Sequence, residues 1–363
     1  MLLAIETSCD ETSVAIVDIN RFSDRSAKPA EFLKADLISS QTDLHVAYGG
    51  VVPELAAREH LQNLPILIDQ AFQSAGCRPD DLSAVAVTRG PGLNGCLLVG
   101  LTFAKSFALA RNLPLLALNH LEGHLFASDL LEIRPEPIYP ALLLLVSGGH
   151  TELVLIKSFR EYELVARTKD DAVGEAFDKS ATLLGLPYPG GPQLAALAAR
   201  GDRARFPFPV GMPEDDSAFS FSGVKTAVRR RVDRLGDELR DPQTLCDVSA
   251  GIETALVEAL LLKLRKAVSH HRPRAVHLSG GVAANTHLQE RLRALLRQKG
   301  IAFFVPPSRW CTDNAAMIGV LGARILLHNA LSFREWHERP LPKADLGPNV
   351  PFDVGAMPRW PLA

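Results

Sequence analysis

Two stretches of the sequence share one design: LLAIETSCDETSVAIVD at residues 2–18 and ALLLLVSGGHTELVLI at residues 141–156. In each, an apolar run is followed by a short polar turn and a second apolar run, which is the pattern of two strands joined by a turn. A design that recurs after about 140 residues indicates a duplicated α/β unit with one polar turn in each copy. The alternative is a pair of unrelated hairpins, which any α/β protein can contain.

Strands and helices are expected to alternate along most of the chain, which favours α/β layers over separate all-α and all-β blocks. The expected strands are Leu2–Glu6, Val14–Asp18, Ala84–Thr88, Leu115–Leu118, Ala141–Val146, Glu152–Ile156, Ala275–Leu278 and Ala302–Val305. The expected helices are Pro53–Ala75, Leu97–Arg111, Asp171–Leu184, Pro192–Ala199, Cys246–His271, Asn285–Lys299 and Asn314–His328. From Leu331 onward, six prolines in 33 residues predict an extended C-terminal strap.

The composition is that of a globular protein of about two domains: of 363 residues, 47% are apolar and 22% are charged. Prolines and glycines interrupt the longest uncharged stretch, so no membrane span is expected. Glu6 and Asp10 interrupt the apolar start, so we expect no secretory signal and a cytoplasmic location. Five scattered cysteines predict neither a disulfide framework nor a CxxC site. With a formal charge of −2, a nucleic-acid partner would need a local basic patch.

Three glycine-rich turns follow expected strands. The backbone N–H groups of Ser147-Gly148-Gly149 can converge on an anion, although an ordinary hairpin turn also favours two glycines. A second Ser-Gly-Gly turn, at 279–281, leads into a helix near Asn285, where a phosphate would be favoured; close strand-to-helix packing is the alternative. In GPGLNG, residues 90–95, Pro91 lacks an N–H and no acidic residue follows at the spacing that a dinucleotide site needs. We interpret this third turn as a packing turn.

His120 and His124 lie four residues apart, which places both imidazoles on one helix face, within reach of one metal ion. Two histidines do not complete a site, and hydrogen-bonded or exposed histidines can have the same spacing. Asp313 is the best candidate for the carboxylate that would complete a site for Fe(II) or Zn(II), and the N-cap of a helix is its alternative role. The motif HLEGH is neither HExxH nor HxxEH, which argues against a metalloprotease.

Two other charged segments are candidates for function. Asp10 and Glu11 lie in the first polar turn, where carboxylates repel a phosphate unless they meet a metal or accept a proton; solvated turn acids are the alternative. A basic cluster on an expected helix consists of Lys225, Arg229, Arg230, Arg231 and Arg234. Such a cluster can contact a phosphate backbone, although it is also typical of a solvated helix face.

Taken together, the motifs resemble those of the tRNA adenosine threonylcarbamoyltransferase family TsaD in its bacterial form. The resemblance covers nearly the whole chain, through IETSCDET, HVAYGGVVPELAAREH, GPGLNG, NHLEGH, LLVSGGHTELV, DDAVGEAFDKSATLLGLPYPGGP, FSFSGVKT, LSGGVAAN, CTDNAAMIG and PRWPL. It implies the ASKHA fold of actin, heat-shock chaperone ATPases and sugar kinases, with two similar α/β lobes around a nucleotide cleft. On that pattern, residues 1–140 form the first lobe, completed by 312–363, and residues 141–311 form the second.

The resemblance also implies the site residues. The metal ligands of the family fall on His120, His124 and Asp313, with one divalent ion per subunit, Fe(II) favoured and Zn(II) the alternative. The substrate contacts of the family fall on Leu145, Val146, Ser147, Gly148, Gly149, Asp178, Gly191 and Asn285. Archaeal and eukaryotic members have a tyrosine that adds a metal contact at the position of Leu145, so a less tightly held metal is expected here.

The activity implied by the resemblance is transfer of a threonylcarbamoyl group from threonylcarbamoyl-AMP to the N6 amine of the adenosine 3′ of the anticodon, in tRNAs that read ANN codons. Asp10 or Glu11 would accept the proton of the amine. The implied partners are tRNA, the adenylate, a TsaB-like paralogue that forms a heterodimer, and a TsaE-like ATPase. One alternative is a non-catalytic paralogue that serves as a dimerisation scaffold. A sugar or acetate kinase is disfavoured because TSCDET lacks an Asp-x-Gly turn.

Overall fold

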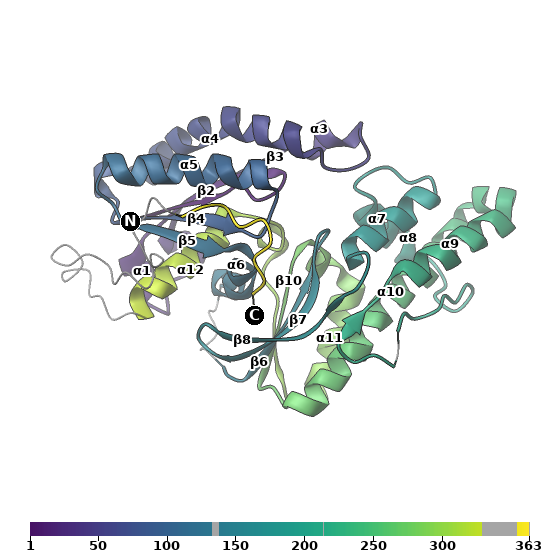
Figure 1. Ribbon diagram of the computed structural model, residues 1–363. Coiled ribbons are helices and arrows are strands. Elements are labelled where there is room, and N and C mark those ends of the chain that lie inside the picture. The colour runs from purple at the N-terminus through teal and green to yellow at the C-terminus, as the bar shows by residue number, and fades with distance from the viewer. Residues whose placement is uncertain (133–137, 213, 329–353, 363) are drawn as a thin grey trace. The chain divides into compact units, whose positions relative to one another are not determined.

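The computed structural model describes residues 1–132, 138–212, 214–328 and 354–362 (Figure 1). Its strands form two sheets, one in each of two compact units of the chain. The first unit is Met1–Glu136 with Asp313–Leu362, and the second is Pro137–Thr312. Most of the expected C-terminal strap lies outside the described residues. Within the described ranges, no helix combines the length and the apolar character that a membrane span requires.

The first unit holds a five-stranded sheet in the order β3-β2-β1-β4-β5. Its strands are β1 Leu2–Glu6, β2 Glu11–Val17, β3 Leu33–Ser40, β4 Ala84–Gly90 and β5 Leu115–Asn119. Its helices are α1 Ile19–Ser23, α2 Pro29–Phe32, α3 Thr42–Val46, α4 Pro53–Ala75, α5 Asn94–Ala110, α6 His120–Phe126 and α12 Ala315–His328. β1, β2 and β3 form an antiparallel meander, and β4 and β5 run parallel to β1.

The second unit holds a six-stranded sheet in the order β11-β10-β6-β7-β8-β9. Its strands are β6 Ala141–Val146, β7 Thr151–Ser158, β8 Glu161–Thr168, β9 Ala218–Phe219, β10 Ala275–Ser279 and β11 Ala302–Phe304. Its helices are α7 Val173–Leu183, α8 Gly190–Ala198, α9 Ser222–Leu235, α10 Pro242–His271 and α11 Thr286–Arg297. β6, β7 and β8 form an antiparallel meander, and β10 and β11 run parallel to β6.

The two sheets have the same topology. Matching β1-β2-β3 to β6-β7-β8, and β4-β5 to β10-β11, gives the same neighbours and the same strand directions in both units. The sequence repeat at residues 2–18 and 141–156 therefore marks a duplicated fold, and the predicted α/β class is confirmed.

The two faces of β1 are covered by different helices, because successive side chains of a strand point to opposite faces. Leu3 and Ile5 belong to a core that also contains Leu64 of α4. Leu2 and Ala4 face α12, where glycines 319 and 322 allow the helix to approach the sheet. In Figure 1, α4 and α5 accordingly lie on one side of the first sheet and α12 on the other.

The carboxyl ends of the parallel strands β1, β4 and β5 meet at one edge of the first sheet. Glu6 ends β1, Thr88 lies near the end of β4, and Asn119 ends β5 immediately before α6. Ligands of open α/β sheets bind outside the carboxyl ends of their strands. The edge that carries Glu6, Thr88 and α6 is therefore where a site is expected.

Most expected elements are confirmed, and the differences have local causes. α10 begins at Pro242 instead of Cys246, because Asp241 accepts a hydrogen bond from the N–H of Thr244 (2.8 Å) and Pro242 suits the first helical position. α5 begins at Asn94 instead of Leu97, and β2 begins at Glu11 instead of Val14. GPGLNG is a packing turn as predicted, because a Cβ at Gly90 would overlap the carbonyl oxygen of Met357.

Candidate metal centre

The first unit positions two histidines on α6. The side chain of Asn119 caps this helix by accepting hydrogen bonds from the N–H groups of Leu121 (2.8 Å) and Glu122 (3.3 Å). The cap fixes the first turn, so that His120 and His124 project from the same face. Their ring centroids lie 4.8 Å apart, and the rings are perpendicular. Both side chains are buried, with exposed fractions of 6% and 1%.

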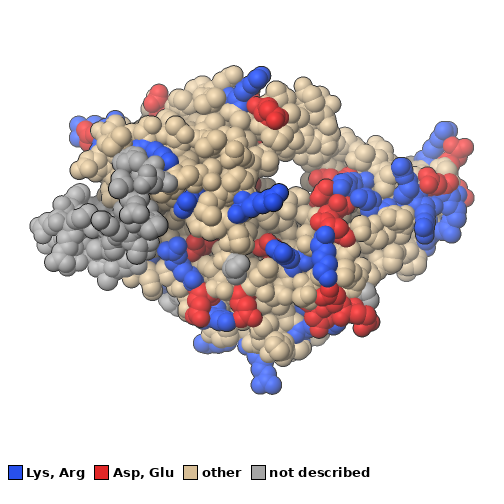
Figure 2. Space-filling view, viewed as in Figure 1, with Lys and Arg blue, Asp and Glu red and all other residues tan. Residues whose placement is uncertain are grey.

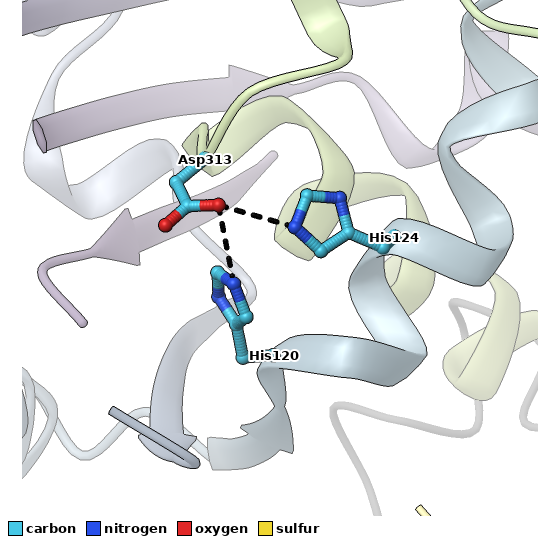
Figure 3. A group of neighbouring side chains, drawn as sticks. All are labelled: His120, His124 and Asp313. Carbon is cyan, nitrogen blue, oxygen red and sulfur yellow. Dashed lines mark hydrogen bonds and ion pairs between the residues drawn. The ribbon is translucent and has the colours of Figure 1, made fainter. Parts of the chain in front are cut away.

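Asp313 reaches the two histidines from the start of α12. Its Oδ1 lies 3.2 Å from Nε2 of His120 and 3.1 Å from Nε2 of His124, as Figure 3 shows. The alternative role of Asp313 as helix cap is filled by its neighbour, because Oδ1 of Asn314 accepts a hydrogen bond from the N–H of Met317 (2.8 Å). Asp313 is therefore available to the imidazoles. The donor atoms of His120, His124 and Asp313 all lie within 4.8 Å of one another.

The charges of this cluster depend on one another. Burial alone would lower the pKa of His120, but the carboxylates of Asp313 and Glu6 raise it well above its ordinary value. Burial alone would raise the pKa of Asp313, but His120 and His124 hold it well below its usual range. The pKa of His124 is lowered, mainly by burial. Without a metal, His120 is the positively charged group between two carboxylates.

The donor set fits a divalent transition metal. Two imidazole nitrogens and one carboxylate oxygen are suited to Fe(II) or Zn(II) when further coordination positions stay open. Two donors come from α6 and are buried, and the third, Asp313, precedes α12 with its side chain 22% exposed. Because a bound divalent ion would replace the Nε2 proton of His120, metal binding by these residues is expected to be pH-dependent.

Glu6 belongs to the same centre, although its place in the sequence does not indicate this. It is fully buried at the end of β1, and its Oε2 lies 3.0 Å from Nδ1 of His120. In the sequence, Glu6 stands out only as a charge inside an apolar run. Its contact with His120 depends on β1 and β5 belonging to one sheet with adjacent carboxyl ends.

The acidic turn of the first unit lies between β1 and β2. The carbonyl oxygen of Asp10 accepts a hydrogen bond from the N–H of Gln41 (3.0 Å), and Glu11 begins β2. Burial, followed by the charges of Asp313 and Asp10, raises the pKa of Glu11 to about 10. In the metal-free chain Glu11 therefore keeps its proton at neutral pH. The assignment of Asp10 and Glu11 as proton acceptors stays a prediction.

The buried network behind this turn holds it in place. Nε2 of His60 lies 2.9 Å from the carbonyl oxygen of Cys9, and Oγ1 of Thr12 lies 2.7 Å from Nδ1 of the same ring. Burial lowers the pKa of His60, so the neutral ring can donate from Nε2 and accept at Nδ1. These two hydrogen bonds tie the polar turn to α4.

In the second unit, the turn after β6 leaves open space above two glycines. The N–H of Ser147 donates to the carbonyl oxygen of His150 (2.8 Å), and Oγ of Ser147 accepts from the N–H of His150 (3.0 Å). Neither Gly148 nor Gly149 has a left-handed φ, and a Cβ on either would have no neighbour within 4 Å. The backbone of the turn does not require glycine. The missing side chains instead leave room for a ligand close to the backbone.

The second Ser-Gly-Gly turn lies beside the first, because β6 and β10 are adjacent parallel strands with Leu145 paired to Ser279. Leu145 and Val146 are fully buried, backbone included, at the end of β6. Both functional groups of the Asn285 amide are engaged: Oδ1 accepts from the N–H of Leu288 (2.8 Å), and Nδ2 donates to Glu253 (2.7 Å). In this structure Asn285 caps α11.

Asp178 and Gly191 contact each other between α7 and α8. Oδ1 of Asp178 accepts a hydrogen bond from the N–H of Gly191 (2.8 Å), at the start of α8. Burial raises the pKa of Asp178, and this N–H limits the increase. The structure therefore brings these two predicted substrate contacts together.

Figure 2 shows lysine and arginine side chains gathered over α9, which carries the predicted basic cluster. Arg229, Arg230 and Arg234 are exposed. The other two cations make contacts within the unit: Lys225 pairs with Asp171 (3.0 Å), and Arg231 lies 5.2 Å from the ring centroid of Phe206. Three of the five cations are thus on the surface.

The duplicated sheets place the chain in the ASKHA fold class, to which actin and the sugar kinases belong. Two solved structures with this fold align well: a full-length HypF in the phosphate- and nucleotide-bound form and the HypF of T. kodakarensis. The first has a TM-score of 0.54 and 14% identity, and covers 92% of this chain and 56% of that one. The second has a TM-score of 0.55 and 16% identity, and covers 90% and 48%. At these identities the likeness shows the fold alone.

The chain belongs to the TsaD family, whose model is described as tRNA N6-adenosine threonylcarbamoyltransferase and matches residues 33–320. A relative of that name from Aromatoleum aromaticum is 46% identical over 363 residues, with 100% of this chain and 97% of the relative covered. Another, from a Synechococcus species, is 48% identical over 325 residues, with 88% and 86% covered. The family resemblance predicted from the sequence motifs is confirmed.

Proposed function

We propose that this chain transfers the threonylcarbamoyl group of threonylcarbamoyl-AMP to the N6 amine of the adenosine 3′ of the anticodon, in tRNAs that read ANN codons. The observation that carries this proposal is similarity along the full chain to relatives named for that transfer. The N6 nitrogen forms a bond to the carbamoyl carbon, the bond from that carbon to the phosphate oxygen breaks, and AMP leaves. The N6 proton must pass to a base. Because the substrate is tRNA, the proposal places the reaction in the cytoplasm.

His120, His124 and Asp313 would hold one divalent metal ion, with Fe(II) favoured and Zn(II) the alternative. When bound, such an ion supplies Lewis-acid polarisation and a template for the acyl group. The residues themselves keep this region dry, because both imidazoles are buried. A dry site strengthens every electrostatic contact made to the developing charge.

The turn of Ser147, Gly148 and Gly149 would bind the phosphate of the adenylate. Support for this role comes from the open space above both glycines, which lets an anion approach the backbone N–H groups. Leu145 and Val146, which directly precede this turn at the end of β6, would complete the contacts to the substrate. Asp178, with Gly191, would hold the ribose, and Asn285 would contact the nucleoside from the start of α11.

Asp10 or Glu11 would accept the N6 proton. Burial and the neighbouring carboxylates raise the pKa of Glu11 to about 10, so Glu11 holds its own proton at neutral pH in the metal-free chain. A cation bound beside Asp313 would lower the pKa of Glu11 and make both carboxylates available.

The proposal includes protein partners: a TsaB-like paralogue that forms a heterodimer with this chain, and a TsaE-like ATPase. The first unit exposes apolar side chains that a paralogue could cover. Leu61 and Ile66 of α4, with Leu98 and Leu109 of α5, are 45–63% exposed. For tRNA, the exposed arginines of α9 offer contacts to the phosphate backbone.

The test is mass spectrometry of nucleosides from an ANN-reading tRNA, incubated with this chain, its partners and threonylcarbamoyl-AMP. We expect threonylcarbamoyladenosine with the parent chain and none with His124→Ala. His270→Ala, an exposed histidine at the end of α10, serves as the control and should retain activity. Absence of product with the parent, while the adenylate stays intact, would favour the scaffold alternative. Product with His124→Ala would retain the transferase and reject the metal assignment.

A further inference from the structure

A fully buried carboxylate lies behind the metal-ligating face of His120. Glu6 ends an apolar strand, and its exposed fraction is 0%. A buried carboxylate is costly unless hydrogen-bond donors surround it. Three donors do so here: the N–H of Ser8 (2.5 Å) at Oε1, and the hydroxyl of Thr88 (2.5 Å) and Nδ1 of His120 (3.0 Å) at Oε2.

The two nitrogens of the His120 ring face different carboxylates. Nδ1 faces Glu6, and Nε2 faces Asp313 at 3.2 Å. A carboxylate accepts hydrogen bonds and cannot donate them, so Glu6 favours the proton on Nδ1. With Nδ1 protonated, the lone pair of a neutral His120 ring is on Nε2, which points toward Asp313 and His124. That nitrogen is the one a metal ion would need.

We infer that Glu6 is a positioning residue for the metal centre, which fixes the orientation and the Nδ1–H tautomer of His120. The inference rests on the metal assignment of the proposed function and is independent of the transfer reaction. Carboxylates that accept the second N–H of a ligating histidine typically contribute 10–100-fold to metal affinity, an order of magnitude known from other metal sites.

The same carboxylate also connects the centre to the acidic turn. Oε1 of Glu6 accepts the N–H of Ser8, and Oγ of Ser8 lies 3.2 Å from Nδ1 of His120. Ser8 precedes Asp10 by two residues. Glu6 therefore connects His120 to the turn that carries Asp10 through two hydrogen bonds.

The test measures Co²⁺ and Zn²⁺ binding to the purified full chain by competition with a chromophoric chelator, without tRNA or adenylate. We expect Glu6→Gln to bind both ions about 10–100-fold more weakly than the parent, with an altered Co²⁺ absorption spectrum. Thr88→Val is the matched control, because it removes a donor to the same carboxylate oxygen without touching His120. Its loss of affinity should be clearly smaller. Parental affinity in Glu6→Gln, or an equal loss in Thr88→Val, would overturn the inference.

A second measurement uses the parent chain alone and so does not depend on the folding of a variant. ¹⁵N NMR of histidine-labelled, Zn²⁺-loaded protein distinguishes the protonated from the metal-bound ring nitrogen. We expect Nδ1–H and a ligating Nε2 for His120. Ligation through Nδ1 would overturn the inference. If the parent binds neither ion, the metal assignment and this inference fail together, while the transferase is decided separately by the nucleoside assay.

Discussion

Gly280→Ala tests whether the two Ser-Gly-Gly turns pack as closely as the structure shows. Gly280 has φ 93° and ψ 162°, a conformation nearly confined to glycine. An added Cβ would also lie 2.7 Å from the carbonyl carbon of Val146 and would overlap its oxygen. The backbone strain costs about 1–3 kcal/mol. Forcing an extra atom into this packed contact costs about 1–3 kcal/mol more.

We therefore expect Gly280→Ala to lower the free energy of unfolding by about 2–6 kcal/mol, the sum of both effects. Urea unfolding followed by circular dichroism measures this change. The matched control is Gly148→Ala in the neighbouring turn, where a Cβ would meet nothing within 4 Å. Its free energy of unfolding should stay within about 0.5 kcal/mol of the parent value. A parental midpoint for Gly280→Ala would refute the packing argument, as would an equal loss in both variants.

Three further predictions follow from other parts of the chain. Asn314→Ala should lower the free energy of unfolding by about 0.5–2 kcal/mol through loss of the α12 cap, measured by urea unfolding; an unchanged midpoint would contradict the cap. Replacing Arg229 and Arg230 by glutamate should weaken tRNA binding and make its affinity less dependent on salt, with the slope of log K against log salt smaller by about one per lost phosphate contact. The same replacement at Arg293 and Arg297 of α11 is the control and should leave the slope unchanged. Equal slopes for both variants would place the tRNA elsewhere. Burial, with Arg203 and Arg291 nearby, lowers the pKa of His287 to about 4. In the unfolded chain the ring has its ordinary pKa of about 6.5. Between these two values only the unfolded chain binds a proton at His287, so the free energy of unfolding decreases as the pH falls. His287→Gln should therefore lose less stability than the parent between pH 7 and pH 5 in urea unfolding, and an identical loss would reject this role.

Buried, regular elements could be predicted from the sequence, and exposed ones could not. β1 and β6 have the predicted boundaries because each is a short apolar run that a polar turn follows, and α4 has them because its buried residues recur with the helical period. β3 and β8 escaped prediction because much of each strand is exposed, as expected near a sheet edge, and LKADLISS and EYELVART have too few apolar residues to alternate. β9 has only two residues and exists through its pairing with β8.

The candidate site was predictable where one element carries its residues. Two histidines four residues apart lie on one face of any helix, and both are in α6. Asp313 was the best candidate for the third ligand, but its local sequence fits a helix cap equally well, and only the structure shows Asn314 in that role. Glu6 had no local indication, because its contact with His120 depends on the order of strands in the sheet.

The proposed metal ligands are far apart in the chain: Asp313 follows His124 by 189 residues, and the whole second unit lies between them in sequence. Chains are made from the N-terminus, and domains generally fold as units during synthesis. A nascent chain that has emerged only as far as α6 holds both imidazoles but lacks the carboxylate. The centre is completed only when synthesis has passed the second unit and reached the segment that begins α12. If the proposed site binds a metal, binding by all three ligands would therefore occur late, after nearly the whole chain has been made.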